Sequence, residues 1–338
     1  MGNRLKEYSD EPKQVADFLP WEAIGPEGVI LCKDESLIGV IEYFPTSDRI
    51  ASREEEPLFR QGWSLWTEKQ HSTVRERYFV ILSWNPFYDK SGNIINSLGN
   101  KEVDEELAEK YFAYELSMLQ KYIHGLARTR KLDYKEIAGF LLFATSFREE
   151  TGVLPEVPID LDFIITQETE YKFLNNSLLI NGQSTVVVSF PGFPGPEDVN
   201  ILYDIFSTEI YRHVRRILAM DSEEYKENFS SYCGTWCKGR KAIKNEIIGD
   251  ITGSVFGYMS ECFVFLMPSD RVELFTQYLT ECMMHLGFPY ILETYNSKDV
   301  WWGSLPGLFR ANINPPPSAI GSIADMIWLS GGDADVQA

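Results

Sequence analysis

Residues 184–206 read STVVVSFPGFPGPEDVNILYDIF, and this stretch decides the fold class. Its first part, residues 186–190, is a short β-branched and aromatic run that ends in a cluster of Pro and Gly at residues 191–196. A short apolar run bounded by Pro and Gly is typical of a buried strand. After the turn, apolar residues recur at helical spacing, at Val199, Leu202, Tyr203 and Phe206. The stretch therefore predicts a strand, a turn and a helix in succession.

The alternation of structure types continues downstream. Residues 210–220 (IYRHVRRILAM) have a periodicity that fits a strand and a helix equally. Asp221 and Glu224 form a capping box, which predicts a long polar helix that runs to about Gly249. Residues 255–266 are dense in Val and Phe and predict another strand. This mixture of strands and helices indicates an α/β or α+β frame.

The N-terminal half shows the same mixture. Two apolar runs, at residues 29–31 and 37–44, flank a polar turn and predict a β-hairpin. The strongest helix signal is residues 104–130, where acidic residues crowd the start and basic residues the end, as the helix dipole favours. Further strands are predicted at residues 62–70, 78–84 and 139–147, and an acidic helix at residues 49–61.

The order of these elements predicts an α+β fold made of two sheet-and-helix modules. In each half the pattern fits a ferredoxin-like split βαβ unit, with a long helix-pair region inserted in the second half. No repeat of the sequence itself accompanies this pattern. We expect a flexible N-terminus at residues 1–17, a first module at 18–150, a connecting region at 151–183, a second module at 184–329 and a linker at 330–338.

Composition narrows the class of function. The chain has 338 residues, 44% of them hydrophobic, which is enough for substantial cores. Its formal net charge of -19 argues against direct nucleic-acid binding, which needs clustered Lys and Arg facing the phosphates. The cysteines are scattered, as expected in a reducing compartment: Cys32, Cys233, Cys237, Cys262 and Cys282. No apolar run reaches the roughly 18 residues of a membrane span, so we expect a cytoplasmic protein.

Motifs for catalysis, cofactor binding and metal binding are missing from the sequence. Residues 234–239 have the glycine spacing of a phosphate-binding loop, but Arg240 and Lys241 follow where Lys and then Ser or Thr are needed. Cys233 and Cys237 could share a helical face, yet one pair supplies only half of a tetrahedral zinc site. We therefore expect no catalytic, cofactor-binding or metal-binding residue, with a thiol-dependent enzyme that uses Cys233 or Cys237 as the alternative.

Three stretches, taken in order, resemble one family of proteins. They are residues 18–37 (FLPWEAIGPEGVILCKDESL), residues 189–241 and the segment WWGSLPG at residues 301–307. Together they are similar to the amino-terminal domain of the CagE/TrbE/VirB family of conjugation and type IV secretion ATPases, and to its TrbE-like branch in particular. The resemblance spans residues 18–329, and it implies that residues 210–220 are a strand.

The family's motor domain has no counterpart in this sequence. Family members continue into a RecA-like motor that binds ATP and Mg²⁺, whereas this chain stops at Ala338. No residue here can inherit the ATP-binding positions, so we expect neither ATP nor Mg²⁺ to bind this chain. The resemblance thus implies either an amino-terminal fragment of such an ATPase or a motor-less regulatory paralogue.

The resemblance also implies a docking and assembly role. In this family the amino-terminal domain attaches the cytoplasmic ATPase to inner-membrane subunits of the secretion channel and helps motors to assemble. We accordingly expect a cytoplasmic protein held at the inner membrane through partner proteins, with homo-oligomers as an option. The candidate contact residues are Leu19, Pro20, Trp21, Trp301, Trp302 and Pro306. For each tryptophan taken singly, core packing is favoured over a partner contact.

Overall fold

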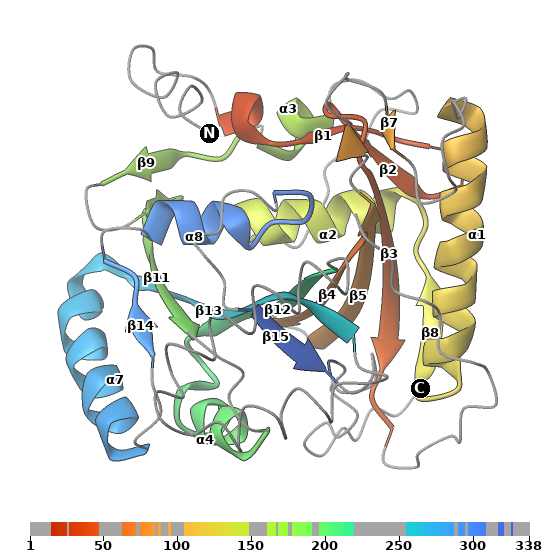
Figure 1. Cartoon of the computed structure of the whole chain (residues 1–338). Helices are drawn as coiled ribbons and strands as arrows, with labels where there is room; N and C mark the ends of the chain where they lie inside the picture. The colour runs from red at the N-terminus through yellow and green to blue at the C-terminus, as the bar shows by residue number, and fades with distance from the viewer. Residues whose placement is uncertain are drawn as a thin grey trace.

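The computed structural model of the chain describes residues 15–25, 27–46, 63–71, 75–84, 87–88, 94–95, 105–148, 161–166, 168–174, 178–190, 196–219, 255–286, 290–294, 297–308, 317–320 and 326. Within these residues the chain forms one large sheet that carries helices on both faces (Figure 1). A separate two-stranded sheet is made of β6 (Phe87–Tyr88) and β7 (Ile94–Ile95).

The large sheet has 13 strands, and every pairing in the described residues is antiparallel. In chain order its strands are β1 (Trp21–Ile24), β2 (Val29–Cys32), β3 (Leu37–Phe44), β4 (Trp63–His71), β5 (Glu76–Trp84), β8 (Arg128–Lys131), β9 (Tyr171–Phe173), β10 (Leu178–Ile180), β11 (Gln183–Phe190), β12 (Ile210–Ala219), β13 (Val255–Pro268), β14 (Ile291–Leu292) and β15 (Pro317–Ile320). Their spatial order is β1-β2-β3-β5-β4-β12-β13-β11-β10-β9, with β8 beside β3, β14 beside β11 and β15 beside β13.

Six α-helices and two short 3-10 helices accompany the sheet in the described residues. They are η1 (Val15–Phe18), α1 (Glu105–His124), α2 (Tyr134–Ser146), α3 (Leu161–Thr166), α4 (Pro196–Phe206), η2 (Ser269–Arg271), α7 (Val272–Leu286) and α8 (Ser297–Gly303). The sheet and these helices confirm the predicted α+β class.

The two halves of the sheet have the same strand order. The first half is arranged as β8-β3-β5-β4 and the second as β14-β11-β13-β12, so the third strand of each half lies between the first and the second. The halves meet where β4 pairs with β12, from Gln70 opposite Arg212 to Ser64 opposite Leu218. The ferredoxin-like description stays a prediction, because the helix expected at residues 49–61 lies outside the described residues. The expected module boundaries stay predictions too.

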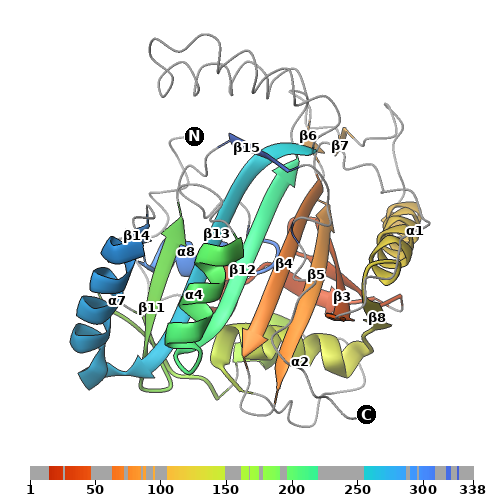
Figure 2. The same ribbon diagram turned by 90° about the horizontal axis from the view of Figure 1, so that it is seen from below.

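Helices cover both faces of the sheet (Figure 2), and a hydrophobic core lies under the helices of each face. On one face, helices α2, α3 and α8 bury their apolar side chains against strand residues such as Trp66, Phe79 and Val264. On the other face, α1 packs in one cluster with residues such as Val80, while α4 and α7 pack in another with residues such as Phe263. Because neighbouring residues of a strand point to opposite faces, Phe79 and Val80 belong to different cores.

One predicted element is wrong. The strand predicted at residues 139–147 does not form, because these residues lie within and just after helix α2. Asp133 caps this helix, with its side chain bound to the backbone N–H of Glu136 and the Glu136 side chain bound back to Asp133. The helix is buried nearly all round its second half, so its sequence lacks the polar stripe that marks a surface helix. A short apolar run of this kind cannot be separated from a strand by periodicity.

The other predicted elements in the described residues are confirmed, except that the helix predicted at residues 104–130 ends before a strand begins at Arg128. The hairpin is β2 and β3, the strands near residues 62–70 and 78–84 are β4 and β5, and residues 184–206 contain most of β11 and all of α4. Residues 210–220 form strand β12, as the resemblance implied. Helix α1 ends at His124, and residues 128–131, most of which were expected in the same helix, form β8. The helix predicted from Asp221 to about Gly249 lies outside the described residues.

Candidate functional site: the junction of residues 19–21 and 301–307

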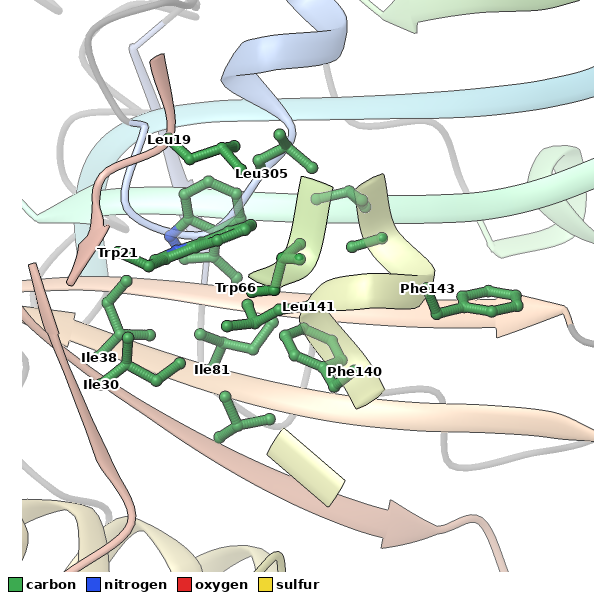
Figure 3. Packing of buried hydrophobic residues seen from close by; sticks show 14 of the residues in the cluster. Leu19, Trp21, Ile30, Ile38, Trp66, Ile81, Phe140, Leu141, Phe143 and Leu305 are labelled. Atoms are coloured by element: carbon green, nitrogen blue, oxygen red, sulfur yellow. The ribbon is translucent and has the colours of Figure 1, made fainter. Parts of the chain in front are cut away.

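The candidate contact residues lie together on the face of the sheet that carries α2 and α8. Leu19, two residues before β1, and Trp21, the first residue of β1, are buried in the same hydrophobic cluster as the two tryptophans of α8. Figure 3 shows Leu19 and Trp21 beside Leu305, which comes from the segment after α8. We call residues 19–21 together with residues 301–307 the junction.

A buried hydrogen bond connects the two parts of the junction. The indole Nε1 of Trp21 donates to the carbonyl oxygen of Pro306 at 2.9 Å. Trp21 has no exposed surface, and Pro306 is also buried. A buried indole N–H normally finds an acceptor, and here that acceptor lies 285 residues along the chain. The first strand and the segment after α8 are therefore positioned by each other.

The chain passes very close to β2 and β3 at the end of the junction. Gly307 has a φ of +87°, which L side chains rarely adopt. A Cβ placed on it would lie 2.8 Å from Cδ1 of Ile38 and 3.1 Å from Cγ of Pro20. Both the backbone conformation and the space therefore require glycine at this position.

Two arginines of β12 bind consecutive carbonyl groups of the junction. Arg216 donates through Nη1 to the carbonyl oxygen of Gly303 at 3.1 Å, and Arg212 donates through Nη2 to that of Ser304 at 3.0 Å. The guanidinium of Arg216 also lies 5.0 Å from the ring centroid of Trp66, a cation–π distance. A positive charge is favourable at the carbonyl end of a helix, and both arginines bind carbonyl groups at the C-terminal end of α8.

Arg212 is neutralised across the line where the two halves of the sheet meet. Its Nε and Nη2 donate to the two carboxylate oxygens of Glu68 on β4, at 2.6 Å and 2.9 Å, and both side chains are fully buried. Burial by itself would lower the pKa of Arg212, but Glu68 more than offsets this and raises it. Arg216 is buried as well, and that burial lowers its pKa to about 10. The Glu68–Arg212 pair therefore connects β4, β12 and the junction.

The structure brings all six sequence-predicted contact residues into the junction, but it exposes little of them. Five are buried and Pro20 is half-buried; the buried five are Leu19, Trp21, Trp301, Trp302 and Pro306. The rings of Trp301 and Trp302 meet edge to face with centroids 4.8 Å apart. Contact with a partner stays a prediction for these side chains, whereas the structure itself shows how they pack inside the chain.

A second group of charged residues lies on the opposite face of the same strands. We call Lys69, His71, His213, Arg215 and Glu261 the ionic cluster. His213 and Arg215 both contact Oε1 of Glu261, at 2.5 Å and 2.9 Å. A carboxylate only accepts hydrogen bonds, so Nε2 of His213 donates. In the neutral ring Nδ1 then accepts from the hydroxyl of Tyr203 on α4, 2.7 Å away.

Burial keeps the histidines of the ionic cluster neutral near pH 7. It lowers the pKa of His213 to about 4, despite the nearby carboxylate of Glu261. It lowers the pKa of His71 to about 4 as well, with a further contribution from the charge of Lys69. Lys69 is itself paired with Glu76 at 3.0 Å and lies 3.9 Å from the ring centroid of Tyr203. The cluster therefore fastens α4 to the middle of the sheet.

The charged side chains of this region pair with one another within the chain. Glu68 on β4 pairs with Arg212, which binds the junction, and within the ionic cluster Glu261 pairs with Arg215. Among the described residues, no group of three or more His, Cys, Asp or Glu side chains could hold a metal ion. Cys32 and Cys262 are buried, and burial raises the pKa of each thiol to about 12, so neither is a reactive thiolate at neutral pH. Cys233 and Cys237 lie outside the described residues.

Sequence reasoning missed the arginines of β12 and their partner. They could have been predicted from the ionisable residues that lie inside strand-forming runs, namely Glu68, Arg212, His213, Arg215, Arg216 and Glu261. A charge inside a strand that is covered on both faces has to be paired.

Within the described residues, no helix is both long enough and apolar enough to cross a membrane.

Comparison with known proteins gives two curated relatives. The chain is 21% identical over 420 residues to the conjugal transfer protein TrbE of Rhizobium radiobacter, an alignment that covers 96% of this chain and 50% of that protein. It is 25% identical over 254 residues to a probable conjugal transfer protein TrbE of Sinorhizobium fredii (the second of its segments), with 66% of this chain and 38% of that protein covered. The chain thus spans about half the length of the first relative and less of the second.

A scan of family models and one solved structure complete the comparison. No protein-family model matches the chain. A solved structure of berberine bridge enzyme is 11% identical, with 74% of this chain and 40% of the enzyme covered, at a TM-score of 0.25. That score is too low to indicate a shared fold.

Proposed function

We propose, because this chain is a TrbE-like member of the conjugal transfer proteins, that it is a docking and assembly unit of a conjugative transfer, or type IV secretion, apparatus. Both curated relatives carry conjugal transfer in their names. The proposed task is attachment of a transfer ATPase to inner-membrane subunits of the channel, with the protein held at the cytoplasmic side of that membrane through its partners.

The observation that carries this proposal is the junction. The segment at residues 301–307, which resembles the family's passage toward the motor, is bound to the sheet through three carbonyl groups. Arg216 binds the first, Arg212 the second and Trp21 the third. A segment fixed in this way moves with the sheet. A force applied to the segment is therefore transmitted to the sheet, and a force applied to the sheet is transmitted to the segment. Such rigid coupling is what a unit that holds a motor on a channel requires.

Binding is favoured over catalysis by the same groups. Charged side chains that are strongly shifted in pKa often mark active sites, but structural ion pairs shift pKa values as well. Here Glu68 pairs with Arg212 and Glu261 with Arg215 and His213, so these groups are already engaged within the chain. We therefore propose that the chain itself carries no enzymatic site and acts through contacts.

A pull-down tests this proposal. The purified chain is immobilised and offered a small inner-membrane subunit of a conjugative transfer channel, in detergent, alongside an unrelated membrane protein of similar size as control. We expect specific retention of the channel subunit. Trp21→Phe, which keeps a large apolar ring but loses the bond to Pro306, should weaken retention while the circular dichroism spectrum stays native. Absence of retention by the wild-type chain would overturn the docking role.

A further inference from the structure

Helix α7 exposes large apolar side chains on the side away from the sheet. Its inner side, with Leu279 and Met283, is buried in the core that it shares with α4, β11 and β13. On the outer side, Leu274 and Met284 are each 73% exposed and Tyr278 is 51% exposed. Single exposed apolar residues are ordinary, but three on one 15-residue helix are not explained by the fold.

The three residues share one broad face of α7. At 3.6 residues per turn, Tyr278 follows Leu274 by about 40° around the helix, and Met284 lies about 80° on the other side of Leu274. The aromatic rings of Tyr278 and Phe206 on α4 are 5.5 Å apart between centroids. Ile205, which precedes Phe206 on α4, is 37% exposed. We call Ile205, Leu274, Tyr278 and Met284 the α7 surface.

Acidic side chains surround this surface. Glu281 is exposed and lies within this face, about 20° from Leu274 on the side of Met284, and Glu273 is exposed beside Leu274. Asp270 precedes the helix and Asp204 lies beside Ile205 on α4, and both are exposed. The basic residues of this part are Arg271 at the helix start and His285 in the last turn of α7. An apolar face with acidic residues within it and at its rim is complementary to a partner that is apolar along one stripe and positive beside it.

We propose that the α7 surface is a docking site for a basic amphipathic helix of a partner protein. Such a helix places its apolar stripe on an exposed apolar face and its Lys and Arg beside the acidic rim. A second copy of this chain is disfavoured as occupant, since a symmetric contact would set one acidic rim against another and the net charge is -19. An anionic membrane surface is repelled by the same charges.

This inference deepens the proposed function, because it names the surface and the chemistry of the docked partner. The first test is independent of partner identity. Its probe is a fluorescent peptide of about five helical turns, with Leu and Lys at helical spacing, and a Leu and Glu peptide of the same pattern is the control. We expect the purified chain to bind the basic peptide in an anisotropy titration and to bind the acidic one at least tenfold more weakly.

The variants are matched in chemistry. Leu274→Lys and Met284→Lys each place a positive charge on the α7 surface, whereas Tyr114→Lys makes the same change of charge at a 59% exposed residue of α1. We expect the first two to weaken binding of the basic peptide tenfold or more, and the third to change it less than twofold. Equal losses in all three variants, equal binding of both peptides or no binding by the wild-type chain would overturn the inference.

The same variants separate this inference from the docking role. If the channel subunit is retained by the wild-type chain and lost with Leu274→Lys but not with Tyr114→Lys, the α7 surface is its site. Equal retention by all three overturns the inference and leaves the docking role standing. Two other occupants have their own readouts. Self-association that Leu274→Lys abolishes, seen by sedimentation equilibrium, or binding of wild-type chain to phosphatidylglycerol vesicles would each assign the surface differently and overturn the inference.

Discussion

The indole Nε1 of Trp21 donates a hydrogen bond to the carbonyl oxygen of Pro306 at 2.9 Å, across 285 residues of the sequence. Both groups are buried, so water does not replace the bond when one partner is removed. This contact ties the first strand of the sheet directly to the segment after α8. Its contribution can be separated from the burial of the ring by a matched pair of variants.

Trp21→Phe should lower the free energy of unfolding by about 1–3 kcal/mol beyond the smaller ring's own cost, because the carbonyl of Pro306 is left buried without a donor. Trp301→Phe is the control. Trp301 is equally buried, but its Nε1 has no hydrogen-bond partner among the described residues, so this variant removes an unsatisfied donor. Urea unfolding followed by circular dichroism measures both. Equal losses in the two variants would show that the Trp21 bond contributes nothing.

Gly307→Ala should destabilise the fold by more than about 1 kcal/mol, since alanine is strained at positive φ and its Cβ would meet Ile38 and Pro20. Gly182→Ala isolates the strain from the crowding. Gly182 has a φ of +78°, but a Cβ there would have nothing within 4 Å. We expect Gly182→Ala to cost clearly less in thermal unfolding. If both cost the same, the close approach at the junction has no energetic weight.

The sequence pattern was sufficient for strands β2, β3, β4, β5, β11 and β13 but not for helix α2. Strand β11 is a short apolar run bounded by turn residues, and this pattern is local, whereas β12 was expected to be a strand only from the resemblance. Helix α2 is surrounded by the sheet, α3 and the junction. Its apolar residues therefore do not form a single stripe at helical spacing, and the same sequence fits a strand. The capping box at Asp133 and Glu136 was the local signal that distinguished the two.

The candidate site was predictable only in part, because its connections are non-local. The Leu-Pro-Trp and Trp-Trp segments could be selected from the sequence, and the structure brings them together. Which atoms join them could not be derived, since Trp21 and Pro306 meet only once the whole sheet has formed. The pairing of β4 with β12 likewise places Glu68 beside Arg212. The identity of a charged residue in the sequence does not indicate a partner 144 residues away.

Arg212→Met should destabilise the chain by about 3–5 kcal/mol, because it leaves the carboxylate of Glu68 buried without a counter-charge and frees the carbonyl of Ser304. Adding Glu68→Leu should recover a large part of the loss, since the double variant removes both charges. Chemical unfolding of the wild-type chain, both single variants and the double variant forms a double-mutant cycle. Strictly additive losses would contradict a direct coupling between the two side chains.

Mg-ATP should produce no binding heat with this chain in isothermal titration calorimetry. The reason lies in the sequence at residues 234–241, where the glycine spacing of a phosphate loop is not followed by the Lys and Ser or Thr that hold phosphate and Mg²⁺. The titration is run at chain concentrations high enough to detect a dissociation constant of about 0.1 mM, a weak nucleotide affinity. A saturable heat signal would contradict the assignment of a binding role without an ATP site.

Acid should weaken the fold between about pH 6.5 and pH 4, and His213 should account for much of the effect. Burial, only partly offset by Glu261, lowers the pKa of this histidine in the folded chain to about 4 from the ordinary value of 6.5. In that window the unfolded chain binds a proton that the folded chain does not, so the free energy of unfolding falls as the pH falls. The loss from one such histidine is on the order of 3 kcal/mol when the window is fully crossed.

His213→Gln separates this effect from the carboxylates. The amide can still contact the hydroxyl of Tyr203 and the carboxylate of Glu261, but it does not titrate. The pKa of Glu261 is lowered by Arg215 and His213 against the opposing effect of burial, so its own contribution is lost only at lower pH, below the ordinary carboxyl value. Urea unfolding at several pH values from about 7 to about 5, within the window of the histidine, should therefore show that the free energy of unfolding depends less on pH in the variant.

Because His71 has its pKa lowered to about 4 in the same way, His71→Gln should also reduce this dependence on pH, and the double variant should reduce it most. Parallel curves for the wild-type chain and His213→Gln would mean that His213 is protonated in the folded state at these pH values, with Glu261 as its counter-ion.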